Sequence, residues 1–270
     1  MNNYEVKITI NNSIYISEGR LKRNQGINKC LPRINVYFCA KISPVGSKNK
    51  LKRFRENETF TNVIQPTREE AVNDDLNLKG NWNKNFFKND NPIILELGCG
   101  KGEYSVGLAK KYPEKNFLGI DIKGARFWRG AKTALEEGMG NVGFLRTQIE
   151  LIENMFSENE VDEIWITFPD PQIKYKRTKH RLTNEAFFDT YRKILKPKGI
   201  MHLKTDSEFM HGYTLGLLQG LKLPIHFAHH DVYGIGDEAP AEVVEIQTFY
   251  ESQYLEVNKK ITYIRFSLDS

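Results

Sequence analysis

The stretch that most constrains the fold is residues 93–121, which read IILELGCGKGEYSVGLAKKYPEKNFLGID. Its opening apolar run is typical of a strand that helices cover on both faces, as in a parallel sheet. The apolar spacing after Glu103 predicts a helix that ends at Pro113, and residues 117–121 predict a second strand. This βαβ unit predicts an open α/β sheet with a ligand site at the glycine-rich loop.

The loop carries Gly98, Gly100 and Gly102 at alternate positions. Residues without a Cβ atom allow a ligand to lie directly against the backbone. Asp121 follows at the tip of the second strand, where a carboxylate is placed to accept hydrogen bonds from both hydroxyls of a ribose. The loop and the acid together indicate a cofactor that contains a nucleoside.

Glu96, within the strand just before the loop, distinguishes between the two common cofactors of this kind. Dinucleotide-binding loops have the spacing G-x-G-x-x-G and bind a pyrophosphate, which a carboxylate here would repel. The spacing in this chain is G-x-G-x-G, and a carboxylate attracts the ammonium and sulfonium groups of S-adenosyl-L-methionine. We therefore predict S-adenosyl-L-methionine as the cofactor. The alternatives are an NAD(P)-dependent oxidoreductase, a non-catalytic RNA-binding protein on the same fold, and a turn without a ligand.

The alternation of apolar strands and amphipathic helices continues along the chain. Further strands are expected at residues 142–145, 161–168, 201–203, 225–228 and 261–267. Helices are expected at residues 124–137, 151–156, 184–195 and 207–221. Seven strands with interleaved helices predict a doubly wound, Rossmann-like α/β domain over residues 91–270, of the size of a class I S-adenosylmethionine-dependent methyltransferase.

Ligands of open α/β sheets bind beyond the carboxyl ends of the strands. The glycine loop, Asp121, Asp170 and Asp206 each follow a predicted strand, so we expect them along one rim. Asp170 lies between two prolines, and residues 174–181 after it contain five Lys or Arg and no acid. A carboxylate beside a basic loop indicates a purine substrate carried on a polyanion; the alternative is an ordinary solvated loop.

The basic character of the chain is concentrated near its N-terminus. Residues 1–64 contain twelve Lys or Arg against four Asp or Glu, so their net charge of +8 exceeds the +5 of the whole chain. GSKNKLKRFR at residues 46–55 has the composition of an arm that contacts RNA phosphates, or of a solvated tail. We assign residues 45–90 to this basic arm and a loose linker, with one short helix near residues 67–72.

Residues 1–44 form a separate segment without apparent chemistry. YEVKITI and SIYIS alternate apolar and polar residues around Asn11 and Asn12, which predicts a β-hairpin, and residues 36–40 predict one more strand. We expect this segment to be either a flexible appendage or an N-terminal extension upstream of a natural start at Val45.

Composition argues against several other classes of protein. No run of 18 apolar residues is present, so no membrane span is expected. Cys30, Cys39 and Cys99 form no C-x-x-C pair, which fits a reducing cytoplasm and argues against a disulfide framework or a zinc site. The histidine-rich residues 226–231 would alternate along a strand, so their rings cannot converge on a metal ion. We expect no metal, and either a monomer or a homodimer.

Five short motifs in this order resemble bacterial tRNA (guanine-N7)-methyltransferases, the TrmB family. They are ELGCGKG, FPDP followed by a lysine, KHRL, KTD, and T-x-Y-E at residues 248–251. The resemblance covers residues 46–270 and implies methyl transfer from S-adenosyl-L-methionine to N7 of the guanosine at position 46, in the variable loop of tRNA. The implied cofactor-binding residues are Glu96, Gly98, Gly100, Asp121, Gln148 and Asp170. Asp170 is also the implied catalytic residue, and the implied substrate-binding residues are Lys174, Asp206, Thr248, Phe249, Tyr250 and Glu251.

The chain departs from the family pattern at three points. The family has D-P-W-P-K where this chain has DPQIK at residues 170–174, so Gln172 removes a stacking role of the tryptophan. Gln148 replaces an acid or an asparagine near the adenine but still donates and accepts hydrogen bonds. In the basic loop the family's histidine and second arginine are exchanged, at Arg177 and His180.

The chemistry of guanine N7 sets what the site must do. This nitrogen carries a free lone pair at neutral pH, so its methylation requires positioning rather than a strong base. The ring gains a positive charge as it is methylated. We therefore predict that Asp170, Asp206 and Glu251 accept hydrogen bonds from N1 and N2 of the base and stabilise this charge. Lys174 is predicted to reach O6 or a phosphate.

Overall fold

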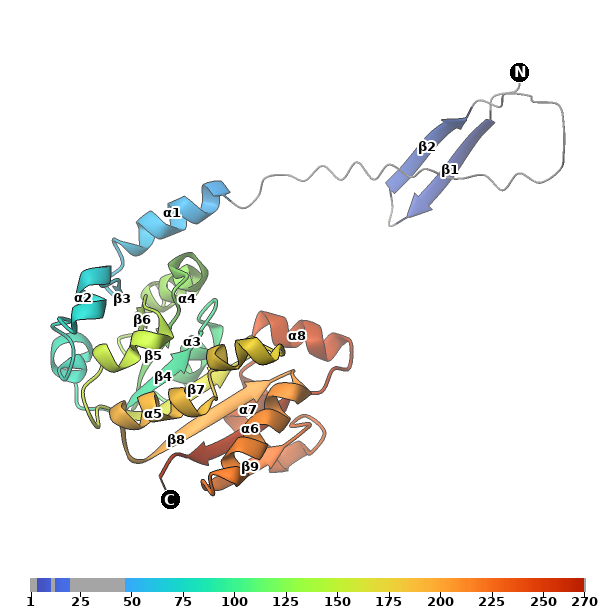
Figure 1. Ribbon diagram of the computed structural model, residues 1–270. Coiled ribbons are helices and arrows are strands. Elements are labelled where there is room, and N and C mark those ends of the chain that lie inside the picture. The colour runs from blue at the N-terminus through green and yellow to red at the C-terminus, as the bar shows by residue number, and fades with distance from the viewer. Residues whose placement is uncertain (1–3, 11–12, 20–46, 270) are drawn as a thin grey trace. The chain divides into compact units, whose positions relative to one another are not determined.

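The computed structural model describes residues 4–10, 13–19 and 47–269. The chain divides into two compact units, Met1–Ser43 and Pro44–Ser270 (Figure 1). The predicted strand at residues 36–40 and the predicted start at Val45 lie outside the described residues.

The first unit contains the predicted hairpin. Strand β1 (Tyr4–Ile10) pairs antiparallel with β2 (Ser13–Gly19), with Ile10 opposite Ser13. This antiparallel pairing of two strands close together in the chain confirms the hairpin prediction.

The second unit is built on an eight-stranded sheet with the order β3-β6-β5-β4-β7-β8-β10-β9. β10 runs antiparallel to β8 and β9, and the other neighbours are parallel. The strands are β3 (Val63–Ile64), β4 (Ile93–Leu97), β5 (Asn116–Ile120), β6 (Val142–Leu145), β7 (Val161–Thr167), β8 (Leu195–Thr205), β9 (Ile225–His229) and β10 (Thr262–Ser267). The doubly wound α/β prediction is confirmed, and β3 is the strand of this sheet that the sequence did not predict.

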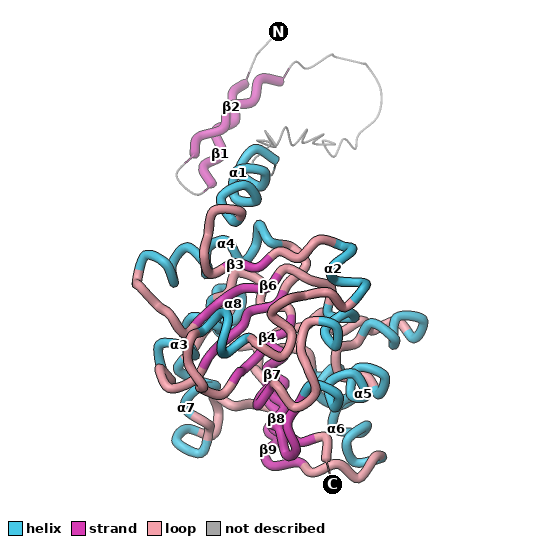
Figure 2. The backbone as a smooth tube through the Cα atoms, turned by 90° about the vertical axis from the view of Figure 1, so that its left-hand side faces the viewer, coloured by secondary structure: helices cyan, strands magenta, loops and turns pink. Residues whose placement is uncertain are grey.

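Helices cover both faces of the sheet. Figure 2 shows α3, α4 and α7 on one face and α2, α5 and α6 on the other. The α-helices are α1 (Ser47–Asn57), α2 (Arg68–Asn73), α3 (Glu103–Lys111), α4 (Gly124–Glu136), α5 (Glu185–Ile194), α6 (Glu208–Gly220), α7 (Ala241–Glu245) and α8 (Phe249–Glu256). Shorter helical segments are the π-helix η1 (Trp82–Phe87) and the 3-10 helices η2 (Ile149–Asn154), η3 (Tyr175–His180) and η4 (Gly236–Glu238).

The central strand β4 is buried along its whole length, as its apolar composition predicts. Ile93, Leu95 and Leu97 belong to one apolar cluster, and Ile94 belongs to another. Because side chains of a strand alternate between the two faces, these two clusters are the cores on either side of the sheet.

The prediction of a loose linker after the basic arm is wrong. β3 pairs with β6, and the predicted short helix is α2, which begins with a capping box between Thr67 and Glu70. Trp82 is fully buried, stacks on Phe156 and donates its indole N–H to the carbonyl of Met155 at 2.9 Å. A few large apolar anchors diluted among Asn and Lys residues give no periodic signal, so the sequence pattern does not predict this packing.

A buried polar network crosses β7, β8 and β10. His202 lies flat on Trp165 with 3.8 Å between the ring centroids, and its Nδ1 is 2.7 Å from the Tyr263 hydroxyl. Its Nε2 is 2.9 Å from a carboxylate oxygen of Glu163, which also accepts the Trp165 indole N–H at 2.7 Å. Burial by itself raises the pKa of Glu163. The hydrogen bond and charge of His202 and the charge of Lys115 outweigh burial and lower the pKa to about 2.

We expect Glu163 to stabilise the fold at neutral pH and to lose this effect in acid. Its folded pKa lies below its unfolded value, so its contribution is full above about pH 4.5 and declines as the pH falls toward 2. The difference corresponds to on the order of 3 kcal/mol of unfolding free energy. Urea unfolding between pH 7 and pH 3 measures it. Glu163→Gln should reduce this loss of unfolding free energy in acid, whereas the exposed control Glu158→Gln should keep it. Equal losses in the two variants would contradict the assignment.

Candidate active site

The carboxyl ends of the parallel strands bring four predicted features to one edge of the sheet. The glycine loop follows β4, Asp121 follows β5, and Asp206 follows β8. Asp170 lies in the loop that follows β7. Because β5, β4, β7 and β8 are consecutive neighbours in the sheet, these features line one continuous rim.

The glycine loop adopts a backbone that only glycine accepts easily. Gly98, Gly100 and Gly102 have φ angles of 77°, 56° and 75°, in the left-handed region. A Cβ atom at Gly102 would lie 2.5 Å from the ring of Phe144, so this position also requires glycine for packing. A Cβ at Gly98 would meet nothing within 4 Å, so the backbone there faces open space that a ligand can occupy.

Glu96 lies at the base of the loop and is 3% exposed. Its carboxylate accepts hydrogen bonds from the Ser105 backbone N–H at 2.9 Å, from the Ser105 hydroxyl, and from the Thr167 hydroxyl at 2.5 Å. Burial raises the pKa of Glu96 to about 7, although these hydrogen bonds oppose the shift. The sequence does not predict the roles of Ser105 and Thr167, because single hydroxyl residues in a helix and a strand carry no motif of their own.

Asp121 ties the glycine loop to the start of α4. Its carboxylate accepts the backbone N–H of Gly100 at 3.2 Å and that of Lys123 at 2.8 Å, and Arg126 lies 3.9 Å away. A carboxylate offers about four lone-pair sites, so these contacts leave acceptor capacity for the hydroxyls of a ribose.

Two hollows lie beside residues next to Asp121: Gly100, whose N–H it accepts, lines one, and Ile122, which follows it in the chain, lines the other. A small one of about 60 Å³ is lined by Glu96, the glycine loop, Arg126, Phe168, Thr248 and Tyr250, among others. A second one of about 400 Å³ is lined by Ile122, Thr147, Gln148 and Leu151, together with residues of 66–72. A nucleoside fits a hollow of this size, and the acceptors Glu96 and Asp121 suit an ammonium group and a ribose. The residues present therefore fit S-adenosyl-L-methionine.

An arginine, Arg181, holds the backbone of the loop that contains Asp170. Asp170 is exposed, and within the loop its carboxylate accepts the backbone N–H of Gln172 at 3.1 Å. Arg181, which is only 5% exposed, donates to the carbonyl of Gln172 at 3.2 Å and to that of Ile173 at 3.3 Å. Lys174 follows as an exposed residue of the same loop.

Arg181 is positioned by aromatic side chains. Its guanidinium carbon lies 4.8 Å from the ring centroid of Phe209 and 4.4 Å from that of Tyr213, both on α6. Such contacts stabilise an arginine that has little exposure to water. In the sequence, Arg181 is only one charge of a basic loop; in the structure, it fixes the backbone after Asp170.

The T-x-Y-E segment forms the start of α8. Thr248 caps the helix, and its hydroxyl and the carboxylate of Glu251 bond reciprocally to each other's backbone N–H at 3.2 Å. Phe249 and Tyr250 are about half exposed, and the ammonium of Lys101 lies 3.6 Å from the Phe249 ring centroid. The cap therefore presents two aromatic rings beside the glycine loop.

Glu251 itself is enclosed, in contrast to its predicted contact with the substrate base. It is 0% exposed, lies 2.6 Å from the ammonium of the equally buried Lys204, and accepts the Tyr233 hydroxyl at 2.9 Å. These partners and the cap occupy its carboxylate, so the structure gives it the role of fixing α8. Asp206 is half-buried and forms an ion pair with Lys259.

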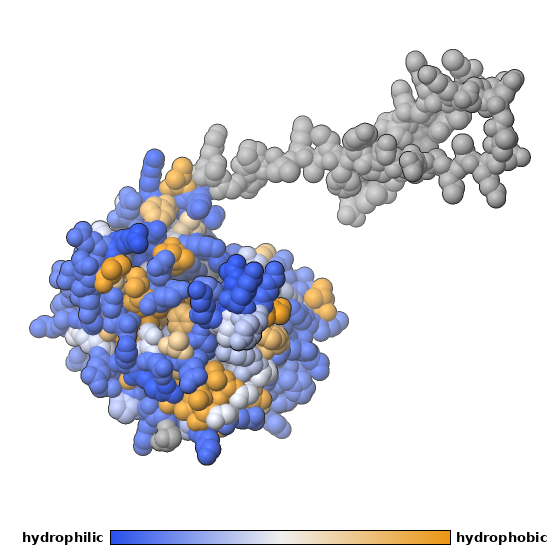
Figure 3. All heavy atoms as spheres, viewed as in Figure 1, coloured by the Kyte–Doolittle hydropathy of each residue, from blue (hydrophilic) through white to orange (hydrophobic). Residues whose placement is uncertain are grey.

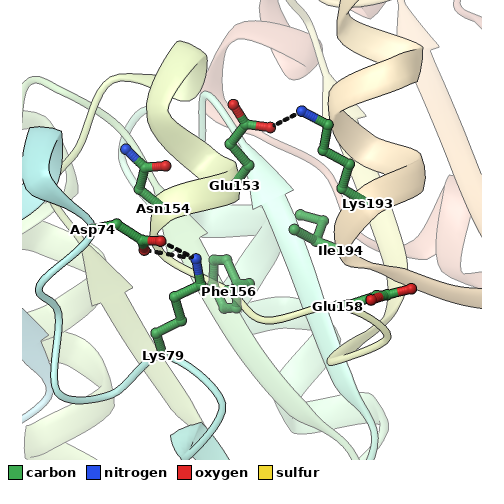
Figure 4. Close-up of a pocket in the computed structure, with 8 residues that line it drawn as sticks. All are labelled: Asp74, Lys79, Glu153, Asn154, Phe156, Glu158, Lys193 and Ile194. Atoms are coloured by element: carbon green, nitrogen blue, oxygen red, sulfur yellow. Dashed lines mark hydrogen bonds and ion pairs between the residues drawn. The ribbon is translucent and has the colours of Figure 1, made fainter.

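A further hollow of about 510 Å³ lies away from the rim, beside the amino ends of β7 and β8. Figure 4 shows that both of its lysines pair with acids, while Glu158 lies apart from these pairs. Lys79 contacts Asp74 at 2.6 Å, and Lys193 forms an ion pair with Glu153. The paired charges leave little for a ligand to bind, so this hollow is not the candidate site.

Metal sites and membrane spans are absent from the part of the chain that the structure describes. Within residues 4–10, 13–19 and 47–269, no three His, Cys, Asp or Glu side chains are grouped so that they could hold a metal ion. No helix of the same residues is long and apolar enough to cross a membrane.

Solved structures share this fold. The 16S rRNA methyltransferase KamB matches with a TM-score of 0.53 at 11% sequence identity, over 69% of this chain and 92% of that chain. An antibiotic-related methyltransferase matches with a TM-score of 0.52 at 15% identity, over 71% of this chain and 94% of that chain. At such identities the likeness shows the fold alone, and it confirms the predicted class I methyltransferase fold.

Relatives in sequence identify the family. The family described as "Putative methyltransferase" matches residues 90–264. A tRNA (guanine-N(7)-)-methyltransferase of Christiangramia forsetii is 70% identical over 224 residues, which are 83% of this chain and 100% of that protein. A protein of the same name from Bacteroides fragilis is 49% identical over 221 residues, 82% of this chain and 86% of that protein. These matches remove the oxidoreductase alternative, and the chain belongs to the tRNA (guanine-N(7)-)-methyltransferase family.

Proposed function

We propose that this protein transfers a methyl group from S-adenosyl-L-methionine to N7 of the guanosine at position 46, in the variable loop of tRNA, in the cytoplasm. The observation that carries the proposal is the rim itself: buried Glu96 and Asp121 flank an open glycine loop, and Asp170 lies exposed after the neighbouring strand. The names of the relatives from Christiangramia forsetii and Bacteroides fragilis supply the substrate.

Different residues of the chain bind different parts of the cofactor. When bound, S-adenosyl-L-methionine supplies an electrophilic methyl group on a sulfonium. Glu96 is placed to bind its ammonium, Asp121 its ribose, and Gln148 the edge of its adenine. Gly98 and Gly100 leave the backbone bare beside these groups.

Positioning of the base accounts for the rest of the mechanism. Guanine N7 needs no proton removed, so the protein has to hold it in line with the methyl group. Asp170 accepts hydrogen bonds from the base and stabilises the positive charge that the ring acquires. Asp206 and Lys174 assist from the neighbouring loops, and Phe249 and Tyr250 provide aromatic surface for stacking.

The predicted basic arm supports an RNA substrate. Residues 47–57 form α1, which packs against α4: Arg53 lies 4.8 Å over the Trp128 ring, and Glu56 accepts the indole N–H of Trp128 at 2.6 Å. Lys50, Lys52 and Arg55 are exposed on this helix. Figure 3 shows mainly hydrophilic side chains across the face of the folded domain that is turned toward the viewer. We propose that α1 contacts tRNA phosphates.

Methyl transfer to unmodified bulk tRNA from a radiolabelled methyl donor tests the proposal. Label at N7 of guanosine 46, found by nuclease digestion and sequencing, is the expected result. Binding of tRNA without transfer would instead support the non-catalytic RNA-binding alternative. Transfer to another nucleotide would refute the assigned position while keeping the chemistry.

We expect the affinity for S-adenosyl-L-methionine to rise with pH below about 7. Glu96 is mostly protonated below its raised pKa of about 7, and an ammonium ligand selects the carboxylate form. Affinity should rise by up to about tenfold per pH unit and level off between about 7 and 8, where the ligand's α-amino group begins to lose its proton. Titration calorimetry from pH 5 to pH 8 measures this dependence.

Two variants serve as controls for this prediction. Glu96→Gln should bind weakly at every pH and lose the slope, whereas Asp121→Ala should bind weakly and keep it. A wild-type affinity that is flat across this range would contradict the assignment of Glu96 to the ammonium.

A further inference from the structure

A hollow of about 600 Å³ lies between α1 and the start of α4, beside the cofactor rim. Five cationic side chains line it: Lys50, Arg53, Lys123, Arg126 and Arg146. Among the described residues, no Asp or Glu lines it. This concentration of one sign of charge contrasts with the hollow near the amino ends of β7 and β8, where both lysines are paired with acids.

The backbone adds to this positive field. α4 is 13 residues long, and its first residues Gly124 and Ala125 line the hollow. Lys123 at its N-cap makes no side-chain cap hydrogen bond, so the helix start is not closed by an acceptor of this residue. The Asp121 carboxylate accepts the Lys123 backbone N–H and the Arg126 backbone N–H donates to the Lys123 carbonyl, so the helix start offers an anion the N–H groups of Gly124 and Ala125 and the partial positive charge of the helix end.

Contacts of Arg146 and Arg53 keep these two cations in place without neutralising them, whereas Arg126 lies 3.9 Å from Asp121. Arg146 donates its Nε–H to the carbonyl of Ile122 at 3.2 Å and lies 4.7 Å from the centre of the Phe54 ring. Arg53 lies over Trp128. A backbone carbonyl and aromatic rings orient a guanidinium but leave its charge available.

The hollow adjoins the site proposed for the cofactor. Arg126 lines both this hollow and the cavity at the glycine loop. Ile122 and Arg146 line both this hollow and the one that contains Gln148. An RNA whose guanosine enters the rim therefore has its backbone close to these five cations.

We infer that this hollow, the α1–α4 pocket, binds a phosphodiester group of the RNA substrate. The inference rests on the proposed function for the identity of the RNA and adds a specific phosphate site to the general contact by α1. A phosphate with several acceptor oxygens suits converging Lys and Arg side chains and a helix N-terminus.

The salt dependence of tRNA binding tests the pocket. Lys50→Ala with Lys123→Ala removes one exposed charge from each wall, and neither side chain belongs to the proposed catalytic or cofactor residues. Each lost phosphate contact should lower the slope of log affinity against log salt by roughly 0.7 to 0.9, so the double variant should lose roughly 1.4 to 1.8. The KM for tRNA should rise while kcat and the KM for the cofactor stay unchanged.

A matched control separates the pocket from general surface charge. Lys84→Ala with Lys222→Ala removes two exposed lysines that line none of these hollows and have no ion-pair partner among the described residues. Its salt slope should stay within about 0.3 of the wild type. Equal losses of slope in the two double variants would overturn the pocket.

Inorganic phosphate distinguishes the source of the anion. Calorimetric binding of inorganic phosphate that disappears in the pocket variant, with an unchanged tRNA slope, would show a free-anion site and overturn the inference. Failure of the pocket and failure of the proposed function can be told apart. A wild type that binds tRNA without methylating it would refute the function, while the loss of salt slope in the pocket variant would still support the pocket.

Discussion

Asp170→Ala should reduce kcat/KM for tRNA methylation by at least about 10² to 10³, the usual effect of removing one preorganised electrostatic group from an active site. Asp170 is exposed, and its described partner is the backbone N–H of Gln172. Because the side chain packs against nothing in the core, the unfolding free energy should change by less than about 0.5 kcal/mol. Single-turnover methylation and urea unfolding measure the two effects.

Two further variants make this test more specific: one separates charge from hydrogen bonding, and the other is a control away from the rim. Asp170→Asn keeps the size and part of the hydrogen bonding but not the charge, so it should recover little activity if charge stabilisation dominates. Asp75→Ala, which removes an exposed acid far along the chain from the rim, should leave activity unchanged. Activity of Asp170→Ala near that of the wild type would remove Asp170 from the mechanism.

The positions that the sequence located correctly share one property: their place at the rim follows from local pattern. The glycine loop, Asp121 and Asp170 each follow a strand with a strong apolar signal, and the parallel topology then brings the strand ends to one rim. The spacing of the motifs along the chain is therefore enough to locate them.

The positions that the sequence missed depend on contacts between distant segments. Trp82 packs on Phe156, and Arg181 is held by aromatic rings on α6 while it supports the loop after Asp170. A single tryptophan or arginine carries no period or spacing, so its partner cannot be read from the chain. Glu251 shows what a motif alone leaves out: the sequence identified the T-x-Y-E segment, but not that this carboxylate is buried and paired with Lys204.

This buried pair predicts the second large effect, which concerns Lys204. The ammonium of Lys204 lies 2.6 Å from Glu251 with neither side chain exposed, and it donates to the carbonyl of Ile246 at 3.1 Å. Burial lowers the pKa of Lys204 to about 8, although the charge of Glu251 opposes the shift. Lys204→Met would leave Glu251 as an uncompensated buried charge, which we expect to cost about 3 to 5 kcal/mol of unfolding free energy.

The double variant decides whether the pair or the lysine alone matters. Lys204→Met with Glu251→Gln removes both charges and keeps an acceptor for the Thr248 backbone N–H, so much of the lost stability should return. The cap of α8 should remain, and with it Phe249 and Tyr250 beside the glycine loop. Chemical denaturation of the wild type, both single variants and the double variant gives the coupling energy directly. A coupling energy near zero would mean that Lys204 and Glu251 do not form the buried pair, and that another contact sets the position of the T-x-Y-E segment.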